Sequence, residues 1–208
     1  MRSTDSNSSE SVEEFKDEIN IEEAIMQAVL TKTLKLNLGL TVRGENNSPF
    51  SGWAQKKHLK GEILSTLIKY ENGKKILGFS WKPNGEECPD TSLRNGKGIL
   101  VEYFQTGAKK VEASYRDGLS NGIVRHWYKN GQIAKEESFV NGKLHGQSVL
   151  WHENGQKTKL VFYMEGMQSG PYSYWTKEGQ KFDEGIYREV KPDGKRTLWS
   201  KDGMERTE

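Results

Sequence analysis

The spacing of hydrophobic residues changes along the N-terminal part of the chain. Residues 1–19 hold Ser, Asp, Glu and Asn with almost nothing apolar, which predicts a disordered acidic tail. Behind Asn20 as an N-cap, apolar side chains fall on one face of a helix, at Ile21, Ala24, Ile25, Ala28 and Val29. This pattern predicts a short amphipathic helix that ends near Lys32.

A strict alternation of apolar and polar residues follows and predicts one lead-in strand, with apolar positions at Leu36, Leu38, Leu40 and Val42. Residues 20–47 are therefore expected to form the helix and this strand. The apolar helix face around Ile21, Ile25 and Val29 is expected to dock on a sheet or to cap its first strand, since an uncovered strand edge promotes aggregation.

From residue 48 onward, glycines and aromatic residues recur at a fixed interval of 24 residues. The glycines that open successive units are Gly98, Gly122, Gly146, Gly170 and Gly194, and the aromatic residues that follow them are Tyr103, Trp127, Trp151, Trp175 and Trp199. The structural turn glycines that close the units include Gly107, Gly131, Gly155 and Gly179, and a second aromatic series consists of Tyr115, Phe139, Tyr163 and Tyr187. Residues 48–205 are accordingly predicted to be one repeat domain. Its unit at 85–98 is two residues short and should be distorted, and its last unit frays around Val190.

Asn-Gly and Asp-Gly pairs divide each unit into two strands. These pairs begin at residues 72, 84, 95, 117, 121, 130, 141, 154, 193 and 202. Both residues of such a pair accept a positive φ, so type I′ hairpin turns are expected at all of them. The predicted fold class is all-β: an elongated single-sheet antiparallel meander of tandem 24-residue β-hairpins, preceded by the short helix and the disordered tail.

Equal offsets in successive units place residues on the same face of a sheet, because side chains alternate across each strand. The tryptophan series is therefore expected to form a ladder that supplies much of the burial, which fits a chain with 33% hydrophobic residues. The same rings are candidate partner-binding residues, since Trp and Tyr are enriched in interface hot spots. The candidates are Tyr103, Trp127, Trp151 and Trp175.

The charge distribution leaves several partners open. Residues 1–24 carry eight acidic and two basic side chains, −6 in all, so the remainder of a chain of net charge +2 carries +8. This fits an anionic partner, a tail that lies on its own body, or simply a solvated face rich in lysine. No signal peptide and no apolar run that could span a membrane are visible, which predicts a cytoplasmic protein; export stays open if the native start lies upstream.

Motifs for catalysis or metal binding are not apparent in the sequence. The single cysteine, Cys88, excludes an internal disulfide and a thiolate metal cluster. The histidines lack metal-ligand spacing, and the glycines recur as turn residues rather than in a phosphate-binding loop. The sequence therefore predicts no enzyme activity, no metal, no cofactor and no nucleic-acid partner.

The repeated unit, seen in GIVRHWYKNGQIAKEESFVNGKLHG at residues 122–146, resembles the MORN repeat in its bacterial variant form. The resemblance covers residues 50–203. Within this class the chain most resembles the YwqK-like group, whose members are labelled as antitoxin components of toxin–antitoxin modules. It implies an elongated, twisted antiparallel sheet that binds other proteins or, in some members, acidic lipid.

Three functions therefore compete. The first is a non-catalytic protein-binding module, in an antitoxin-like or scaffold role, whose partner (a toxin is one candidate) lies against the aromatic-lined sheet. The second is binding to acidic lipid at a membrane surface. The third is binding to cell-wall glycans, because Gly/Trp hairpin repeats also occur in solenoids that hold choline or sugars. The first is preferred, and the third is weakened by the missing export signal.

Overall fold

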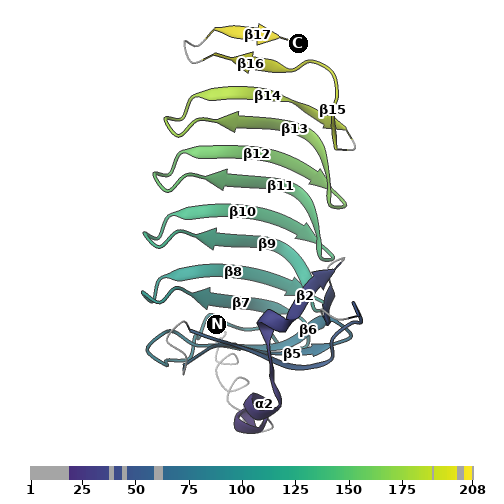
Figure 1. Ribbon diagram of the computed structural model, residues 1–208, viewed down its shortest axis with the longest axis vertical. Coiled ribbons are helices and arrows are strands. Elements are labelled where there is room, and N and C mark those ends of the chain that lie inside the picture. The colour runs from purple at the N-terminus through teal and green to yellow at the C-terminus, as the bar shows by residue number, and fades with distance from the viewer. Residues whose placement is uncertain are drawn as a thin grey trace, which may run out of the picture.

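The strands of the computed structural model lie side by side in an elongated stack, with one helix near the N-terminal end (Figure 1). The structure describes residues 19–37, 40–43, 46–58, 63–188, 190–200 and 204–207. The predicted disordered tail at 1–19 therefore lies outside the described residues, apart from Ile19. The predicted all-β class, with hairpin following hairpin in an antiparallel meander, is confirmed.

The helical elements are α2 (Ile21–Gln27) and the short 3-10 helix η1 (Thr31–Thr33). The strands of the N-terminal part are β1 (Val29–Leu30), β2 (Leu34–Asn37), β3 (Leu40–Arg43), β4 (Gly52–Lys57), β5 (Leu64–Glu71) and β6 (Lys74–Ser80). The remaining strands are β7 (Gly98–Tyr103), β8 (Lys109–Arg116), β9 (Leu119–Trp127), β10 (Ile133–Val140), β11 (Lys143–Trp151), β12 (Lys157–Met164), β13 (Met167–Trp175), β14 (Lys181–Arg188), β15 (Lys191–Pro192), β16 (Thr197–Trp199) and β17 (Glu205–Thr207).

The described strands are divided among three sheets. Strands β2 and β3 form a two-stranded sheet, and β1, β4, β5 and β6 form a four-stranded sheet in that order. Strands β7 to β17 form an eleven-stranded sheet, the long sheet, in which neighbours along the chain pair with each other up to β14. The break between the four-stranded sheet and the long sheet falls at residues 81–97, in the unit that is two residues short. The distortion predicted for this unit is therefore a separation of two sheets.

The helix is shorter than the sequence predicted. Asn20 caps it as expected, because its side chain accepts a hydrogen bond of 3.0 Å from the Glu23 amide. The helix ends at Gln27 rather than near Lys32. Its end is fixed by β1, which pairs in parallel with β4 and holds this part of the chain extended. Pairing with a neighbouring strand has thus overridden the helical spacing of the apolar residues.

The N-terminal segment both docks on the four-stranded sheet and covers its edge. Ile21 and Ile25 pack against a cluster that includes Leu67 and Phe79, and β1 lies alongside β4 at the edge. Val29 is no longer on the helix face and packs against the junction core instead. The single predicted lead-in strand is wrong, because the chain reverses within it and β2 pairs antiparallel with β3.

The Asn-Gly and Asp-Gly pairs form two kinds of turn, except for the pair that begins at 121, which lies within β9. At the pairs that begin at 72, 95, 117 and 141, both turn residues have positive φ, for example +52° at Asp117 and +73° at Gly118, so the type I′ prediction is confirmed there. It is wrong at the pairs that begin at 84, 121, 130, 154 and 193, where only the glycine has a positive φ. The pair that begins at 202 lies outside the described residues.

Side-chain hydrogen bonds explain the second kind of turn. The side-chain oxygens of Asn130 and Asn154 each accept a hydrogen bond from the backbone amide two residues further on, at 3.0 and 3.1 Å. Such a bond holds the asparagine in an Asx turn without a positive φ. The amide groups of the same side chains donate to the carbonyls of Glu153 and Lys177, at 3.0 and 2.9 Å. Each asparagine therefore ties its own turn to the equivalent turn of the following unit.

The largest core lies at the junction of the four-stranded sheet and the long sheet. Both sheets contribute to it: Phe50, Ala54, Ile68, Tyr70, Leu93, Leu100, Ala113, Tyr115 and Val124. Beyond the junction the hairpins form a single layer (Figure 1), so their side chains are covered only by neighbours on the same sheet. Trp127, Trp151 and Trp175 are only half-buried there. The tryptophan series thus supplies less of the burial than expected, because two covering layers exclude more water than one.

Candidate interaction surfaces

The two aromatic series lie on opposite faces of the long sheet. A row of directly paired residues crosses β7 to β14: Val101, Glu112, Arg125, Glu136, Val149, Leu160, Ser173 and Glu184. The tryptophans stand two residues beyond this row and share its face, which we call the tryptophan face. The other series pairs with the opening glycines, such as Phe139 with Gly122, and lies on the opposite or tyrosine face.

The predicted partner-binding residues share the tryptophan face but differ in accessibility. Trp127, Trp151 and Trp175 are half-buried. Tyr103 is only 8% exposed, and its hydroxyl lies 2.9 Å from Sγ of Cys88. Burial raises the pKa of Tyr103 well above its usual value, and the contact with Cys88 adds to the shift. Tyr103 therefore offers a partner little surface.

The predicted turn glycines occupy the edge of the sheet opposite the type I′ turns. Gly107, Gly131, Gly155 and Gly179 have φ between +83° and +86°. Each donates its amide proton to the carbonyl three residues earlier, as Gly131 does to Tyr128 at 3.0 Å. A residue with a Cβ is disfavoured in this left-handed conformation, so the position of these glycines fits a role in chain reversal.

The tryptophan face has a charged half over β8 to β10. Nε of Arg125 lies 2.7 Å from the carboxylate of Glu136, and Nζ of Lys109 lies 2.9 Å from that of Glu112. A longer contact of 3.9 Å joins Arg125 to Glu112. These groups are partly exposed, so the ion pairs contribute little to stability but fix the pattern of charge on the surface.

The same face becomes mainly apolar over β11 to β14, with one ion pair in β14, where Nζ of Lys181 lies 2.6 Å from the carboxylate of Glu184. Where the charged half has Glu112, Arg125 and Glu136, the row continues with Val149 and Leu160. The residues of this apolar half are Val149, Trp151, Leu160, Phe162, Met164, Pro171, Trp175 and Ile186, all placed on one face by the strand register. Met164 is 57% exposed and Ile186 is 51% exposed. Large apolar side chains therefore face solvent on the face that also carries two of the tryptophans.

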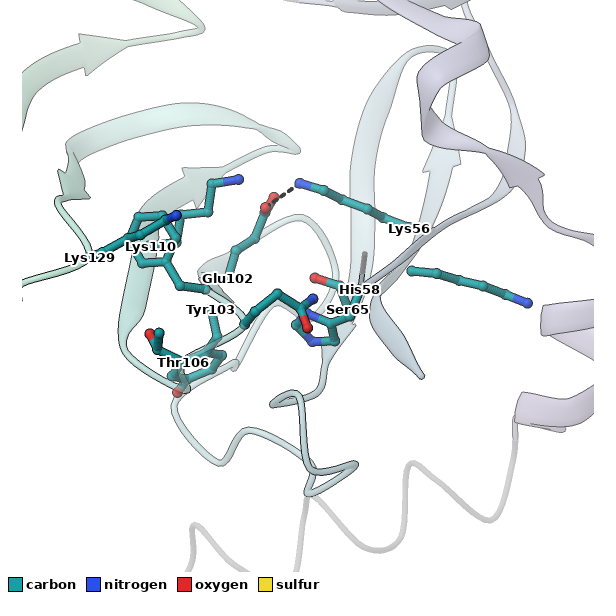
Figure 2. A pocket seen from close by; sticks show the side chains of 11 residues that line it. Lys56, His58, Ser65, Glu102, Tyr103, Thr106, Lys110 and Lys129 are labelled. Carbon is teal, nitrogen blue, oxygen red and sulfur yellow. Dashed lines mark hydrogen bonds and ion pairs between the residues drawn. The ribbon is translucent and has the colours of Figure 1, made fainter. Parts of the chain in front are cut away.

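A cleft of about 240 Å³ opens between the four-stranded sheet and the first hairpin of the long sheet. We call it the lysine cleft, because Lys56, Lys57, Lys110 and Lys129 line it. Figure 2 shows the Lys56 ammonium reaching the carboxylate of Glu102, at 2.5 Å. The ammonium of Lys110 lies 5.9 Å from the centre of the Phe104 ring. The cleft thus combines cationic side chains with an aromatic and polar wall.

Neither the apolar half nor the lysine cleft was predicted from the sequence. Apart from the repeated aromatic residues Tyr103, Trp151 and Trp175, both consist of residues that vary between units, whereas the search for a repeat selects residues that stay the same. The available signal was this variation: 24 residues beyond Lys110 stands Ala134, and 24 residues beyond Val140 stands Met164. A residue repeated in every unit serves every unit alike, so a unique surface must come from the positions that differ.

The histidines occupy separate positions in the described structure. Nε2 of His58 lies 3.0 Å from the carbonyl oxygen of Trp81, and His126 lies on the tyrosine face, where burial and then Lys135 lower its pKa. Among the described residues, no three His, Cys, Asp or Glu side chains group so that they could hold a metal ion. Nor does any helix in that part of the chain have the length and apolar character to cross a membrane.

Fold and surfaces together define a class: a repeat protein of stacked antiparallel hairpins that presents two different sheet faces. The family model for the MORN repeat variant matches residues 120–141, which span the second strand pair of the long sheet. Over these residues the chain is therefore similar to the MORN repeat, and such repeats are generally non-catalytic modules that often bind protein or membrane. A search of curated proteins finds no match to the chain.

Proposed function

We propose that the protein is a non-catalytic binding module that holds a partner protein on the apolar half of its tryptophan face. The observation that carries this proposal is the exposure of Met164 and Ile186, at 57% and 51%, close to Phe162 and Pro171 on the face that also carries Trp151 and Trp175. A folded protein rarely leaves such side chains grouped in water unless another surface covers them.

The composition of this face is suited to protein recognition. Trp and Met are enriched in protein interfaces, and methionine adapts its shape to different partners. The charged half next to it, with Arg125 between Glu112 and Glu136, supplies a fixed pattern that can orient a partner and reject others. The apolar half would then supply most of the affinity and the charged half the register.

The finer role that we propose is antitoxin-like or scaffold binding. Its support is the likeness to MORN repeats together with a face that has room for one protein along several hairpins. In the antitoxin case the partner is a toxin, and in the scaffold case it is a component to be positioned. Both roles use the same surface, so one set of variants tests the surface for either role.

The test substitutes the two exposed residues in the full-length protein, Met164→Asp with Ile186→Asp, and measures the Kd for a partner captured from the native cell. Covering each side chain is worth about 1.5–3 kcal/mol, so together they should account for at least a hundredfold in affinity. Met26→Asp is the matched control, because Met26 is 80% exposed on α2 and away from the tryptophan face. Equal binding by the double variant and the control would contradict the proposal.

A second candidate function is binding to an acidic lipid surface, which the lysine cleft favours. Lys57, Lys110 and Lys129 line this cleft. Vesicles that contain phosphatidylserine should then bind the protein at low salt and release it as the ionic strength rises, since exposed charges are screened. Failure to bind at low ionic strength would rule this candidate out, and it would leave the protein-binding proposal untouched.

A further inference from the structure

The lysine cleft carries an excess of positive charge. Four lysines line it, Glu102 is the one acid among the lining residues, and the charge sum is therefore +4 − 1 = +3. Glu102 is engaged by Lys56. Within the described part of the chain, no carboxylate forms an ion pair with Lys110 or Lys129. The cleft is therefore matched to a group of negative charges rather than to a single one.

This charge is particular to the junction and does not follow from the repeat. The residues 24 positions beyond Lys110 and Lys129 are Ala134 and Glu153, which carry no positive charge. The lysines come together because the chain breaks between two sheets here, so that β4, which ends in Lys56 and Lys57, lies across the cleft from the first hairpin of the long sheet, where Lys56 reaches Glu102. The next unit therefore does not reproduce the two lysines that the first hairpins contribute to the cleft.

The chain itself supplies a complementary segment next to the cleft. Residues 1–18 carry six acidic and two basic side chains, a sum of 2 − 6 = −4. The acids lie between residues 5 and 18: Asp5, Glu10, Glu13, Glu14, Asp17 and Glu18. They enter the described structure at Ile19, which packs with the apolar cluster under α2. The depression lined by Ile21 and Ile25 shares Lys57 with the cleft, so the acidic segment starts beside it.

We propose that the acidic residues 5–18 occupy the lysine cleft of their own chain. A segment of 18 residues can extend to about 60 Å. Its length therefore does not limit its access to the cleft, which shares Lys57 with the depression beside the start of the segment. Covalent connection gives the segment an effective concentration in the millimolar range, which offsets the weakness of exposed ion pairs. The segment is released as salt screens the charges.

Carbodiimide cross-linking of the full-length protein, read by mass spectrometry, tests this contact because the reagent joins a carboxylate directly to an amine. At low salt, the acids of residues 5–18 should be joined to Lys56 and Lys57. In the double variant Lys110→Gln with Lys129→Gln, the yield of these cross-linked products should fall at least fivefold. The matched control is Lys157→Gln with Lys177→Gln, two exposed lysines of later hairpins, and it should keep them.

Two further arms make the result decisive. In an equal mixture of chains with ¹⁴N and ¹⁵N, the cross-links should join segments of the same isotope, and a mixed product at equal yield would overturn the proposal in favour of a second copy. Raising the salt to about 0.5 M should abolish the products, since the Debye length then shrinks to a few ångströms. Tail cross-links spread evenly over Lys157, Lys177 and the cleft would also overturn it. None of these outcomes depends on the apolar half of the tryptophan face, so the proposed function stands or falls separately.

Discussion

The contact between the two sheets can be measured with a matched pair of glycine substitutions. Gly118 and Gly166 are the second residues of equivalent hairpin turns, with φ of +73° and +88°. A Cβ on Gly118 would lie 2.6 Å from Cβ of Lys74 and 3.0 Å from the carbonyl oxygen of Lys75, both in β6. A Cβ on Gly166 would meet nothing within 4 Å. The substitutions Gly118→Ala and Gly166→Ala therefore differ in packing and share the backbone strain.

The expected magnitudes follow from this difference. The left-handed conformation costs an alanine about 1–2 kcal/mol. Restriction of the unfolded chain returns about 0.4–1 kcal/mol, so Gly166→Ala should destabilise by roughly 1 kcal/mol. Gly118→Ala adds the overpacking of the junction, about 1–3 kcal/mol. We therefore expect it to destabilise by about 2–4 kcal/mol.

The assay should report on the junction itself, because hairpin repeats can open locally. The Lys75 amide donates to the Gly118 carbonyl at 3.0 Å, so its hydrogen-exchange rate monitors the contact of the two sheets. Gly118→Ala should speed this exchange at least tenfold, and Gly166→Ala should leave it nearly unchanged. Urea unfolding of both variants gives the total loss. Equal losses, or an unchanged Lys75 amide in Gly118→Ala, would refute the packing argument.

Three further predictions follow from single residues. Val190 has φ of +66° in the turn position that glycine fills in earlier units; Val190→Gly should raise stability by about 1 kcal/mol in urea unfolding, and no gain would contradict the assigned strain. Asn154→Ala should cost about 1–2 kcal/mol in the same assay, because it loses the 2.9 Å bond to the Lys177 carbonyl and its own turn bond; an unchanged midpoint would show that the turns are not tied together. Burial, and then Lys135, lower the pKa of His126, so its NMR titration should centre below the usual value of about 6.5. Because the unfolded chain then binds the proton more readily, the contribution of neutral His126 to the free energy of unfolding is fully present above that value and falls as the pH drops below it. Lys135→Met should raise the midpoint of the His126 titration, and a wild-type midpoint at or above 6.5 would contradict the burial.

The repeat could be predicted from the sequence because it depends on contacts between residues close together in the chain. A turn requires a residue that accepts positive φ, and a strand of fixed length separates one turn from the next, so Gly131 and Gly155 recur at the same step as Trp127 and Trp151. The hairpins, their order and the common face of the tryptophans follow from that spacing, and so does the cap at Asn20. Each of these features depends on residues only a few positions apart.

The tertiary structure decided the features that depend on residues far apart in the chain. The helix stops at Gln27 because β1 pairs with β4, and the Asn154 side chain ties its turn to the next unit through its bond to the Lys177 carbonyl. The separation of the two sheets, which creates both the main core and the lysine cleft, arises where a short unit meets its neighbours. The spacing of residues along one strand does not contain these contacts, because their energy comes from segments that only the folded chain brings together.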